Sequence, residues 1–591
     1  MSEHLPQSEI NNILDSILNG VECISEIIEL IRNPPENGSI ALIRLNRLIG
    51  NEEIRILFPK EKQSSDPVYG IHIESLNDGK SSKSYSQPTF PKADYISHIT
   101  SVGKSSKEKP LPNYHPLFKL WNSHNFNKDW MRITQQDIMS GIENKDTKDD
   151  YGASFFLLRK LINLEPKLLD FIVNCYNRLL DHEICPEWRN CCLVPAHKGG
   201  DTSIPKNFRP LTILPLFVRI WDSVISKKLG ELLKKYGVID TLVQRGVLSG
   251  VGGLTQNVFD VNHAMCSISD NDICFFIDIT NAYGSVNYGL LCHILREYNF
   301  SPALTEYIKT YYMNAQASYD GQIFRWDNGL YQGSGLSNIL FLIYMDYVLK
   351  NAMTDLKMMR IIDFGFDLQK KTRAFVDDLV IFLPKKSCGP AIQFIQMLFI
   401  QFYDLEINQS KTYFFMNDVK VSELAIGDIQ FKRVHIDFRY LGLGLMCFQE
   451  EFLDNYRKII RSYLEEIDTF GIDPKYKLYL YYRRVFQRIN RTLKCYYAIH
   501  GRTDGLNEIM KLIGYFIYRW TGAFPSEYLA KHIEYIANKV SSVELPESDV
   551  VNFQTLFGIE NPMDDDFRKE MKEMKGMNRL DDMDPYFQKS R

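Results

Sequence analysis

Three aspartates stand beside apolar segments, in positions where carboxylates can act on a phosphorylated substrate. Asp278 directly follows the apolar run 274–277, while Asp377 and Asp378 separate the apolar stretches 374–376 and 379–382. Short apolar runs of this kind predict buried strands, so each acid is expected at the rim of a sheet. Adjacent like charges repel, and a bound cation would keep both ionised. Oxygen-only ligands favour magnesium or manganese.

Two strands that each end in a carboxylate indicate a reaction class. Carboxylates from different strands can bridge two metal ions about 3.5–4 Å apart for in-line phosphoryl transfer. One ion would activate a primer 3′-hydroxyl, and the other would neutralise the triphosphate and the leaving pyrophosphate, which predicts nucleotidyl transfer. Each acidic site also has a structural interpretation. Asp278 could cap the helix that follows it, and Asp377 with Asp378 could form a hairpin turn.

Further motifs surround these acids in a definite order along the chain. They are Pro186–Arg189, 193–195, 198–200 with Lys198, 207–211 with Arg209, Tyr283, 332–341 with Gln332 and Gly333, 408–412 with Lys411, and 440–442 with Tyr440 and Gly442. Each motif is weak alone, because single charged residues are mostly solvated and single aromatic residues are mostly buried. Their joint order is far more specific.

In order and spacing, residues 135–444 resemble the palm of reverse transcriptases, most closely those of non-LTR retrotransposons and group II introns. The resemblance implies that Asp278 and Asp377 bridge two magnesium ions, with manganese as an alternative. It also implies that the backbone carbonyl of Ile279 is a further metal ligand and that Asp378 is a supporting acid.

The same resemblance implies roles for the other motif residues. These roles are triphosphate binding by Lys198 and Arg209, base-pair contact by Gln332 and Gly333, sugar selection by Tyr283, proton donation to pyrophosphate by Lys411, and primer contact by Tyr440 and Gly442. Cations clamp a triphosphate through charge-assisted hydrogen bonds, a lysine can act as a general acid, and a bulky ring excludes a 2′-hydroxyl. Three residues depart from the family pattern: Tyr331 replaces Arg, Asn338 replaces Pro, and Gly284 replaces Asp.

Composition is compatible with a large folded enzyme. The chain has 591 residues, of which 45% are hydrophobic and 24% charged, and this length predicts more than one domain. The net charge of −4 is an average, because basic residues concentrate in 475–502. None of the 11 cysteines forms a CxxC pair, and no apolar run is long enough to span a membrane. We therefore expect an intracellular protein of the nucleus or cytoplasm that has no membrane partner.

The alternation of strand and helix patterns leaves α+β or α/β open for the centre of the chain. The resemblance implies the α+β class, a right-hand polymerase with fingers, a palm of antiparallel sheet plus helices, a helical thumb and an N-terminal extension. The expected divisions are a helical extension at 1–60 with a helix over 8–32, a Ser/Lys/Pro-rich linker or insertion at 61–113, fingers and palm at 114–450, and a helical thumb with an acidic tail at 451–591. In the thumb, cations are expected to hold the duplex backbone: Arg483, Arg484, Arg488 and Arg491. The alternative is an amphipathic helix whose basic face is only solvated.

The resemblance implies an RNA-dependent DNA polymerase, encoded by or derived from a non-LTR retroelement. Its partners would be an RNA template, a DNA or RNA primer, and deoxynucleoside triphosphates. One alternative is an RNA-dependent RNA polymerase, which would be expected to carry Gly-Asp-Asp and to lack an aromatic gate. A second alternative is a maturase-like RNA-binding protein that keeps the fold but synthesises little DNA.

Overall fold

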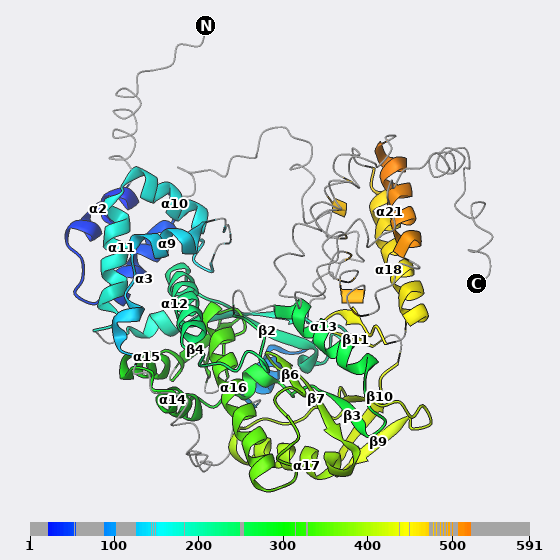
Figure 1. The fold of residues 1–591 in the computed structure, drawn as a ribbon. Coiled ribbons are helices and arrows are strands. Elements are labelled where there is room, and N and C mark those ends of the chain that lie inside the picture. Colours follow the sequence, from blue (N-terminus) through cyan, green and yellow to red (C-terminus); the bar gives the residue numbers. More distant parts are fainter. Residues whose placement is uncertain are drawn as a thin grey trace. The chain divides into compact units, whose positions relative to one another are not determined.

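The structure is a computed structural model of the chain (Figure 1). It describes residues 22–54, 88–101, 126–471 and 506–521 together with separate positions between 477 and 499. Short gaps lie at 53, 144, 146, 148, 182–183, 249–252, 314, 327–328, 436–437 and 448. The chain divides into two compact units. Unit 1 comprises Met1–Val251, Phe276–Thr412 and Ala425–Gln430, and unit 2 comprises Gly252–Phe275, Tyr413–Leu424 and Phe431–Arg591.

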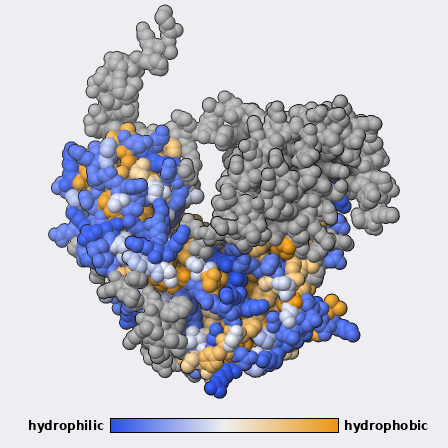
Figure 2. Space-filling model, in the orientation of Figure 1, coloured by the Kyte–Doolittle hydropathy of each residue, from blue (hydrophilic) through white to orange (hydrophobic). Residues whose placement is uncertain are grey.

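The N-terminal part of unit 1 is helical. Its helices are α2 (Glu22–Arg32), α3 (Gly38–Ile49), α9 (Gln135–Ile142), α10 (Phe155–Leu164), α11 (Lys167–Arg178) and α12 (Leu216–Lys235). Helix α11 packs against α2, α3, α9 and α10, so these elements form one cluster (Figure 1). The face of this cluster shown in Figure 2 is largely hydrophilic, as expected for amphipathic helices whose apolar sides are buried. Helix α2 confirms the C-terminal part of the helix expected over 8–32, and residues 8–21 lie outside the described ranges.

The core of unit 1 is organised around a long buried helix, α16 (Gly335–Met358). This helix is apolar on nearly all sides, and 17 of its residues are buried, which is the pattern of a helix enclosed by protein. Helices α12, α14 (Tyr288–Glu297) and α17 (Lys385–Phe402) pack against it, while α15 (Pro302–Tyr312) packs on α14.

A four-stranded sheet in unit 1 has the order β2-β1-β4-β5. Its strands are β1 (Cys191–His197), β2 (Phe208–Ile213), β4 (Ala315–Tyr319) and β5 (Gln322–Trp326). Strands β1 and β2 are antiparallel, with Ala196 opposite Arg209. This pairing places the 198–200 turn beside the start of β2.

A six-stranded sheet has the order β6-β7-β3-β8-β10-β9. Its strands are β3 (Asp272–Ile277), β6 (Thr372–Phe375), β7 (Asp378–Pro384), β8 (Tyr413–Phe415), β9 (Glu423–Ile426) and β10 (Ile429–Arg433). Strands β6 and β7 are antiparallel, with Phe375 opposite Asp378, so they form the hairpin that 374–382 predicts. The mixture of helices with sheets that contain antiparallel pairs confirms the α+β class.

Part of the segment expected to be a linker is folded in unit 1. Residues 92–101 form α7 (Lys92–Ser101), which contacts β5 and the short helix η3 (Pro205–Asn207). Phe90 and Tyr95 form a small aromatic core with Phe208, the residue before Arg209. Residues 88–101 of the expected linker or insertion are therefore folded against unit 1. Phe208, which packs against Phe90 and Tyr95, lies more than 100 positions away in the chain, so the local composition of the segment does not reveal this contact.

Unit 2 contains a second set of helices and a short hairpin. Its elements are α13 (Gly253–Cys266), β11 (Arg439–Tyr440), β12 (Leu443–Gly444), α18 (Gln449–Thr469) and α21 (Leu506–Thr521). Helices α18 and α21 pack on each other. Among the helices in the described residues of both units, none has the length and apolar character needed to cross a membrane.

Candidate active site

Asp278 lies directly after β3 and is fixed by the segment 406–408. The amide of Asn408 donates to the Asp278 carboxylate at 2.9 Å, and its backbone N–H donates to the Asp278 carbonyl at 2.8 Å. Ile279 forms an antiparallel bridge with Ile407 and is buried. The carboxylate of Asp278 is therefore held by the side chain of Asn408, which begins the motif 408–412 that also carries Lys411.

Asp377 lies in the tight turn between β6 and β7. Because Phe375 pairs with Asp378, only Val376 and Asp377 connect the two strands. Val376 has a φ of 64°, in the left-handed region that β-branched residues rarely adopt. The hairpin turn that was an alternative interpretation of this acidic pair is thus present, and it presents the acids at the strand ends.

The three acids are close enough to influence one another. Burial raises the pKa of Asp278, while Lys411 and the Asn408 hydrogen bond lower it. Burial also raises the pKa of Asp377, the charge of Asp278 adds to this, and Arg209 and Lys411 oppose it. Desolvation by the surrounding protein raises the pKa of Asp378 to about 6, with further contributions from Asp377 and Asp278, although its side chain reaches solvent.

Three predicted cations lie around these acids. Desolvation lowers the pKa of Lys198, and the nearby charges of Arg209 and Lys411 lower it further. The backbone N–H of Lys198 donates to the Asn207 carbonyl at 2.7 Å, and this hydrogen bond closes the turn between β1 and β2. Arg209 and Lys411 both act electrostatically on Asp377. The structure thus brings together the acids and the cations that the sequence places far apart.

The glycine-rich motif 332–341 runs beside β2. The Thr212 N–H donates to the Gln332 carbonyl at 2.8 Å, and Gln332 forms a parallel bridge with Leu211. Gly333 has a φ of 142°, and a Cβ at this position would lie 2.3 Å from the Thr212 carbonyl oxygen. Only glycine fits such a close approach. Gln332 and Gly333 therefore lie next to the strand that carries Arg209.

Tyr283 is held on α16 by two contacts. Its ring stacks on Phe341 with a centroid distance of 4.6 Å, and its hydroxyl donates to the Asn338 amide oxygen at 2.9 Å. Burial raises the pKa of Tyr283, and the charge of nearby Asp377 raises it further. The departure from the family pattern at Asn338 thus supplies a hydrogen bond that fixes the Tyr283 ring near the acids.

Tyr331, another departure from the family pattern, has a structural role. Its side chain is fully buried and packs against Tyr311, Tyr312 and Trp326. A tyrosine in place of arginine here extends an aromatic core under the glycine-rich turn.

A metal ion fits the chemistry of the acidic cluster. Among the described residues, no group of three or more His, Cys, Asp or Glu side chains is arranged to hold a metal ion unaided. Magnesium is commonly held by one or two carboxylates, with waters and substrate phosphates as the remaining ligands. Asp278 and Asp377 offer hard oxygen donors, and their mutual repulsion would be relieved by a bound cation.

The predicted primer-contact residues lie in unit 2. Tyr440 is buried and its hydroxyl accepts a hydrogen bond from the Asn257 amide at 2.9 Å, so its ring supports the hairpin from inside. Leu441 and Gly442, with φ of 50° and 80°, form the two-residue turn between β11 and β12, and Gly442 is exposed. A hollow beside this turn is lined by residues of the hairpin and of α18. The predicted thumb cations lie outside the described residues: Arg483, Arg484, Arg488 and Arg491.

The buried carboxyl group of Asp222 supports the glycine-rich turn through hydrogen bonds. Asp222 on α12 is fully buried and accepts hydrogen bonds from the Ser334 hydroxyl and from the Tyr311 hydroxyl. Ser334 caps α16 by accepting from the Leu336 N–H at 3.1 Å. Burial raises the pKa of Asp222 to about 7, and the hydrogen bonds from Ser334 and Tyr311 oppose the rise.

Asp222→Asn is expected to change how stability depends on pH. The pKa of Asp222 in the folded protein lies above that of an unfolded aspartate. The contribution of protonated Asp222 to stability is therefore fully present below about pH 4 and is lost as the pH rises through about 7. Asparagine is neutral and can still accept from Ser334. The free energy of unfolding of Asp222→Asn, relative to that of wild type, should therefore rise by roughly 1–4 kcal/mol between about pH 5 and about pH 8. Denaturant unfolding at both pH values measures this difference, and a difference that does not vary with pH contradicts it.

Three residues that support the site were not assigned such roles from the sequence. They are Asn408, which binds Asp278; Asn338, which binds Tyr283; and Gln244, which binds the backbone of Val376. Asn408 and Asn338 lie inside motifs that the sequence singled out, so only their contacts were missed. Gln244 lies outside those motifs, and no local pattern marks it.

Residues 196–445 match the family model described as reverse transcriptase (RNA-dependent DNA polymerase). The match spans the three acids, the three cations, Tyr283 and the glycine-rich turn. The chain therefore contains a reverse transcriptase domain.

Relatives of this domain occur in retrotransposons. The chain is 20% identical over 333 residues to "Probable RNA-directed DNA polymerase from transposon BS" of Drosophila melanogaster, covering 53% of this chain and 36% of that protein. It is 27% identical over 192 residues to "Retrovirus-related Pol polyprotein from type-1 retrotransposable element R2" of Nasonia vitripennis, covering 30% of this chain and 18% of that protein. The resemblance to reverse transcriptases of non-LTR retrotransposons is confirmed.

The chain spans about a third or less of the length of these two curated relatives. Among solved structures, the RNA-dependent RNA polymerase of a human picorbirnavirus is 12% identical, with a TM-score of 0.38, and the match covers 79% of this chain and 90% of that one. A likeness of this size carries no argument about function.

Proposed function

We propose that this protein is an RNA-templated DNA polymerase that extends a DNA or RNA primer with deoxynucleoside triphosphates. The observation that carries the proposal is the convergence of Asp278 and Asp377 with Lys198, Arg209 and Lys411 inside a reverse transcriptase domain. Acids and cations combined in this way suit nucleotidyl transfer, in which metal-bound phosphates need both positioning and charge neutralisation.

Each residue has a distinct part in the proposed reaction. Asp278 and Asp377 would hold two magnesium ions, supported by Asp378 and the carbonyl of Ile279. When bound, such ions favour ionisation of a primer 3′-hydroxyl and neutralise the triphosphate. Lys198, Arg209 and Lys411 complete the site.

The cations act on the phosphates. Lys198 and Arg209 are exposed at the β1–β2 turn and would bind the triphosphate through charge-assisted hydrogen bonds. Lys411 would deliver a proton to the departing pyrophosphate. Gln332 and Gly333 would contact the nascent base pair. At Gly333 the absence of a side chain permits close approach of the backbone.

Contacts outside unit 1 would hold the nucleic acid. The exposed turn at Gly442, supported by Tyr440, would contact the primer, and the basic stretch 475–502 would bind the backbone of the template–primer duplex. The RNA template and the primer are thus the proposed macromolecular partners.

Primer extension tests the proposal. The full chain is given a defined RNA template with an annealed DNA primer, magnesium, and either deoxyribonucleotides or ribonucleotides. We expect template-length DNA and a strong preference for deoxyribonucleotides. A preference for ribonucleotides would instead assign an RNA-dependent RNA polymerase. Tight RNA binding without extension would assign a maturase-like protein.

A further inference from the structure

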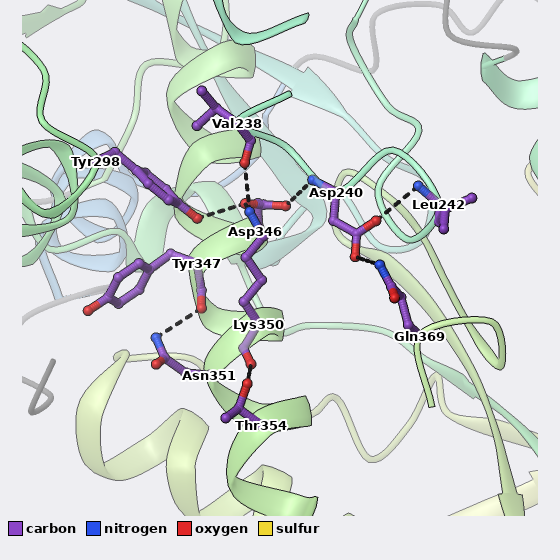
Figure 3. A network of polar contacts seen from close by, with 10 residues as sticks. All are labelled: Val238, Asp240, Leu242, Tyr298, Asp346, Tyr347, Lys350, Asn351, Thr354 and Gln369. Carbon is purple, nitrogen blue, oxygen red and sulfur yellow. Dashed lines mark hydrogen bonds and ion pairs between the residues drawn. The ribbon is translucent and has the colours of Figure 1, made fainter. Parts of the chain in front are cut away.

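A buried polar network anchors the segment 238–246 to helix α16 (Figure 3). The Asp240 N–H donates to the Asp346 carboxylate at 2.8 Å, and the Lys350 ammonium donates to the Val238 carbonyl at 2.6 Å. Asp346 also pairs with Lys350 at 2.6 Å and accepts from the Tyr298 hydroxyl at 2.7 Å. This segment therefore has a fixed position on the central helix of unit 1.

The same network reaches the strand that leads to the acids. The Gln369 amide donates to the Asp240 carboxylate at 2.6 Å, just before β6 (Figure 3). The Ala374 N–H donates to the Val243 carbonyl at 2.7 Å, and the Arg245 N–H donates to the Ala374 carbonyl at 3.0 Å. Residues 243–245 thus run alongside the last residues of β6.

Gln244 completes this arrangement with its side chain. Its carboxamide oxygen accepts from the Val376 N–H at 2.9 Å, and its amide nitrogen donates to the Val376 carbonyl at 3.0 Å. Gln244 is fully buried, and its own N–H donates to the Asp240 carbonyl at 2.8 Å. Both backbone polar groups of Val376 are therefore bound by one rigidly placed side chain.

Val376 is the residue of the turn that needs such support. Its positive φ is unfavourable for a β-branched residue, so the conformation persists only where the surroundings impose it. The turn is also packed closely, because a Cβ on Gly246 would lie 2.6 Å from the Val376 Cγ2. Gly246 itself donates its N–H to the Gln244 carboxamide oxygen at 3.1 Å.

We infer that Gln244 is a positioning residue for the catalytic turn: its carboxamide holds Val376 in the left-handed conformation and thereby directs Asp377 and Asp378. The inference rests on the proposed function, because it explains how the same acids are aimed. A carboxamide is the one side-chain group of this length that supplies an acceptor and a donor together. Neither a carboxylate nor an apolar side chain of similar size can bind both groups of Val376.

The test compares Gln244→Met with a matched control, Asn351→Leu. Both changes replace a buried amide by an apolar side chain of similar size, and Asn351 lies on α16 with a hydrogen bond to the Tyr347 carbonyl at 3.0 Å (Figure 3). We expect Gln244→Met to lower kcat tenfold or more with little change in the nucleotide KM, while the control keeps the wild-type kcat at a similar loss of thermal stability. Mn²⁺ binding, followed by electron paramagnetic resonance, should weaken in Gln244→Met and not in the control.

Adding Val376→Gly separates a positioning role from simple destabilisation. Glycine adopts a positive φ without support, so Gln244→Met should cost several-fold less in kcat in the Val376→Gly background than in wild type. An equal loss in both backgrounds, or a wild-type kcat with wild-type Mn²⁺ binding in Gln244→Met, overturns the inference. If the wild-type chain makes no DNA, the proposed function fails, and Mn²⁺ binding in the same variants still decides the role of Gln244.

Discussion

Asp377→Asn is expected to reduce DNA synthesis by roughly a thousandfold or more while the fold and RNA binding are largely retained. The amide cannot supply the negative charge that a bridging ligand needs, and the loss of transition-state stabilisation amounts to several kcal/mol. Asp278→Asn should act as strongly, because Asp278 is the other carboxylate proposed to hold the metal ions. Asn408 holds that carboxylate in place. Single-nucleotide extension under single-turnover conditions measures the effect without interference from product release.

Two control variants make the result specific. Asp378→Asn should cost less, because Asp378 is exposed and is proposed only to support the other two acids. Asp363→Asn removes an exposed acid that pairs with Lys386, and it should extend the primer at the wild-type rate. If purified Asp377→Asn extended the primer at near the wild-type rate, the assignment of the active site would be wrong.

Tyr283→Ala is expected to raise ribonucleotide use relative to deoxyribonucleotide use by on the order of 10- to 100-fold. The ring is fixed by stacking on Phe341 and by its hydrogen bond to Asn338, so it cannot move aside easily. Removing it opens space for a 2′-hydroxyl, and steric exclusion of this kind is worth about 1–3 kcal/mol. The ratio of kcat/KM for matched ribo- and deoxyribonucleotides on one RNA template is the measurement.

Tyr283→Phe distinguishes the ring from its hydroxyl group. Phenylalanine keeps the stacking surface and loses only the hydrogen bond to Asn338, so it should remain selective for deoxyribonucleotides. Asn338→Ala removes the same hydrogen bond from the other side and should behave like Tyr283→Phe. An active Tyr283→Ala enzyme with an unchanged ratio would remove this residue from sugar selection and weaken the case for DNA synthesis.

Much of the site was predictable because its parts follow local rules. Apolar runs that end in Asp278 and at Asp377 predict strands whose ends carry the acids, and the structure has both strands. The order of the motifs along the chain then indicates the enzyme class. These features depend on neighbours in the chain, so sequence patterns report them.

Contacts between distant segments were not predictable in the same way. Gln244 is an ordinary polar residue in the sequence, and its role arises only because the segment 238–246 docks on α16 and meets the turn at Val376, 132 positions away. Residues 88–101 have the composition of a linker, yet Phe90 and Tyr95 find a partner in Phe208 and order the segment. Burial of apolar rings outweighs weak local preferences here.

The sequence by itself determined the strands that carry the acids, because these follow from periodicity and residue chemistry. The order of its motifs resembles one family, and that resemblance implied the family of the domain and the α+β class. Only the tertiary structure decided which neutral side chains hold the acids and the aromatic ring in position. The physical reason is that an amide side chain forms hydrogen bonds with whatever backbone or side chain the fold brings near, and for the buried Gln244 these bonds must be satisfied. Asn408, Asn338 and Gln244 found those partners through packing that joins segments far apart in the chain.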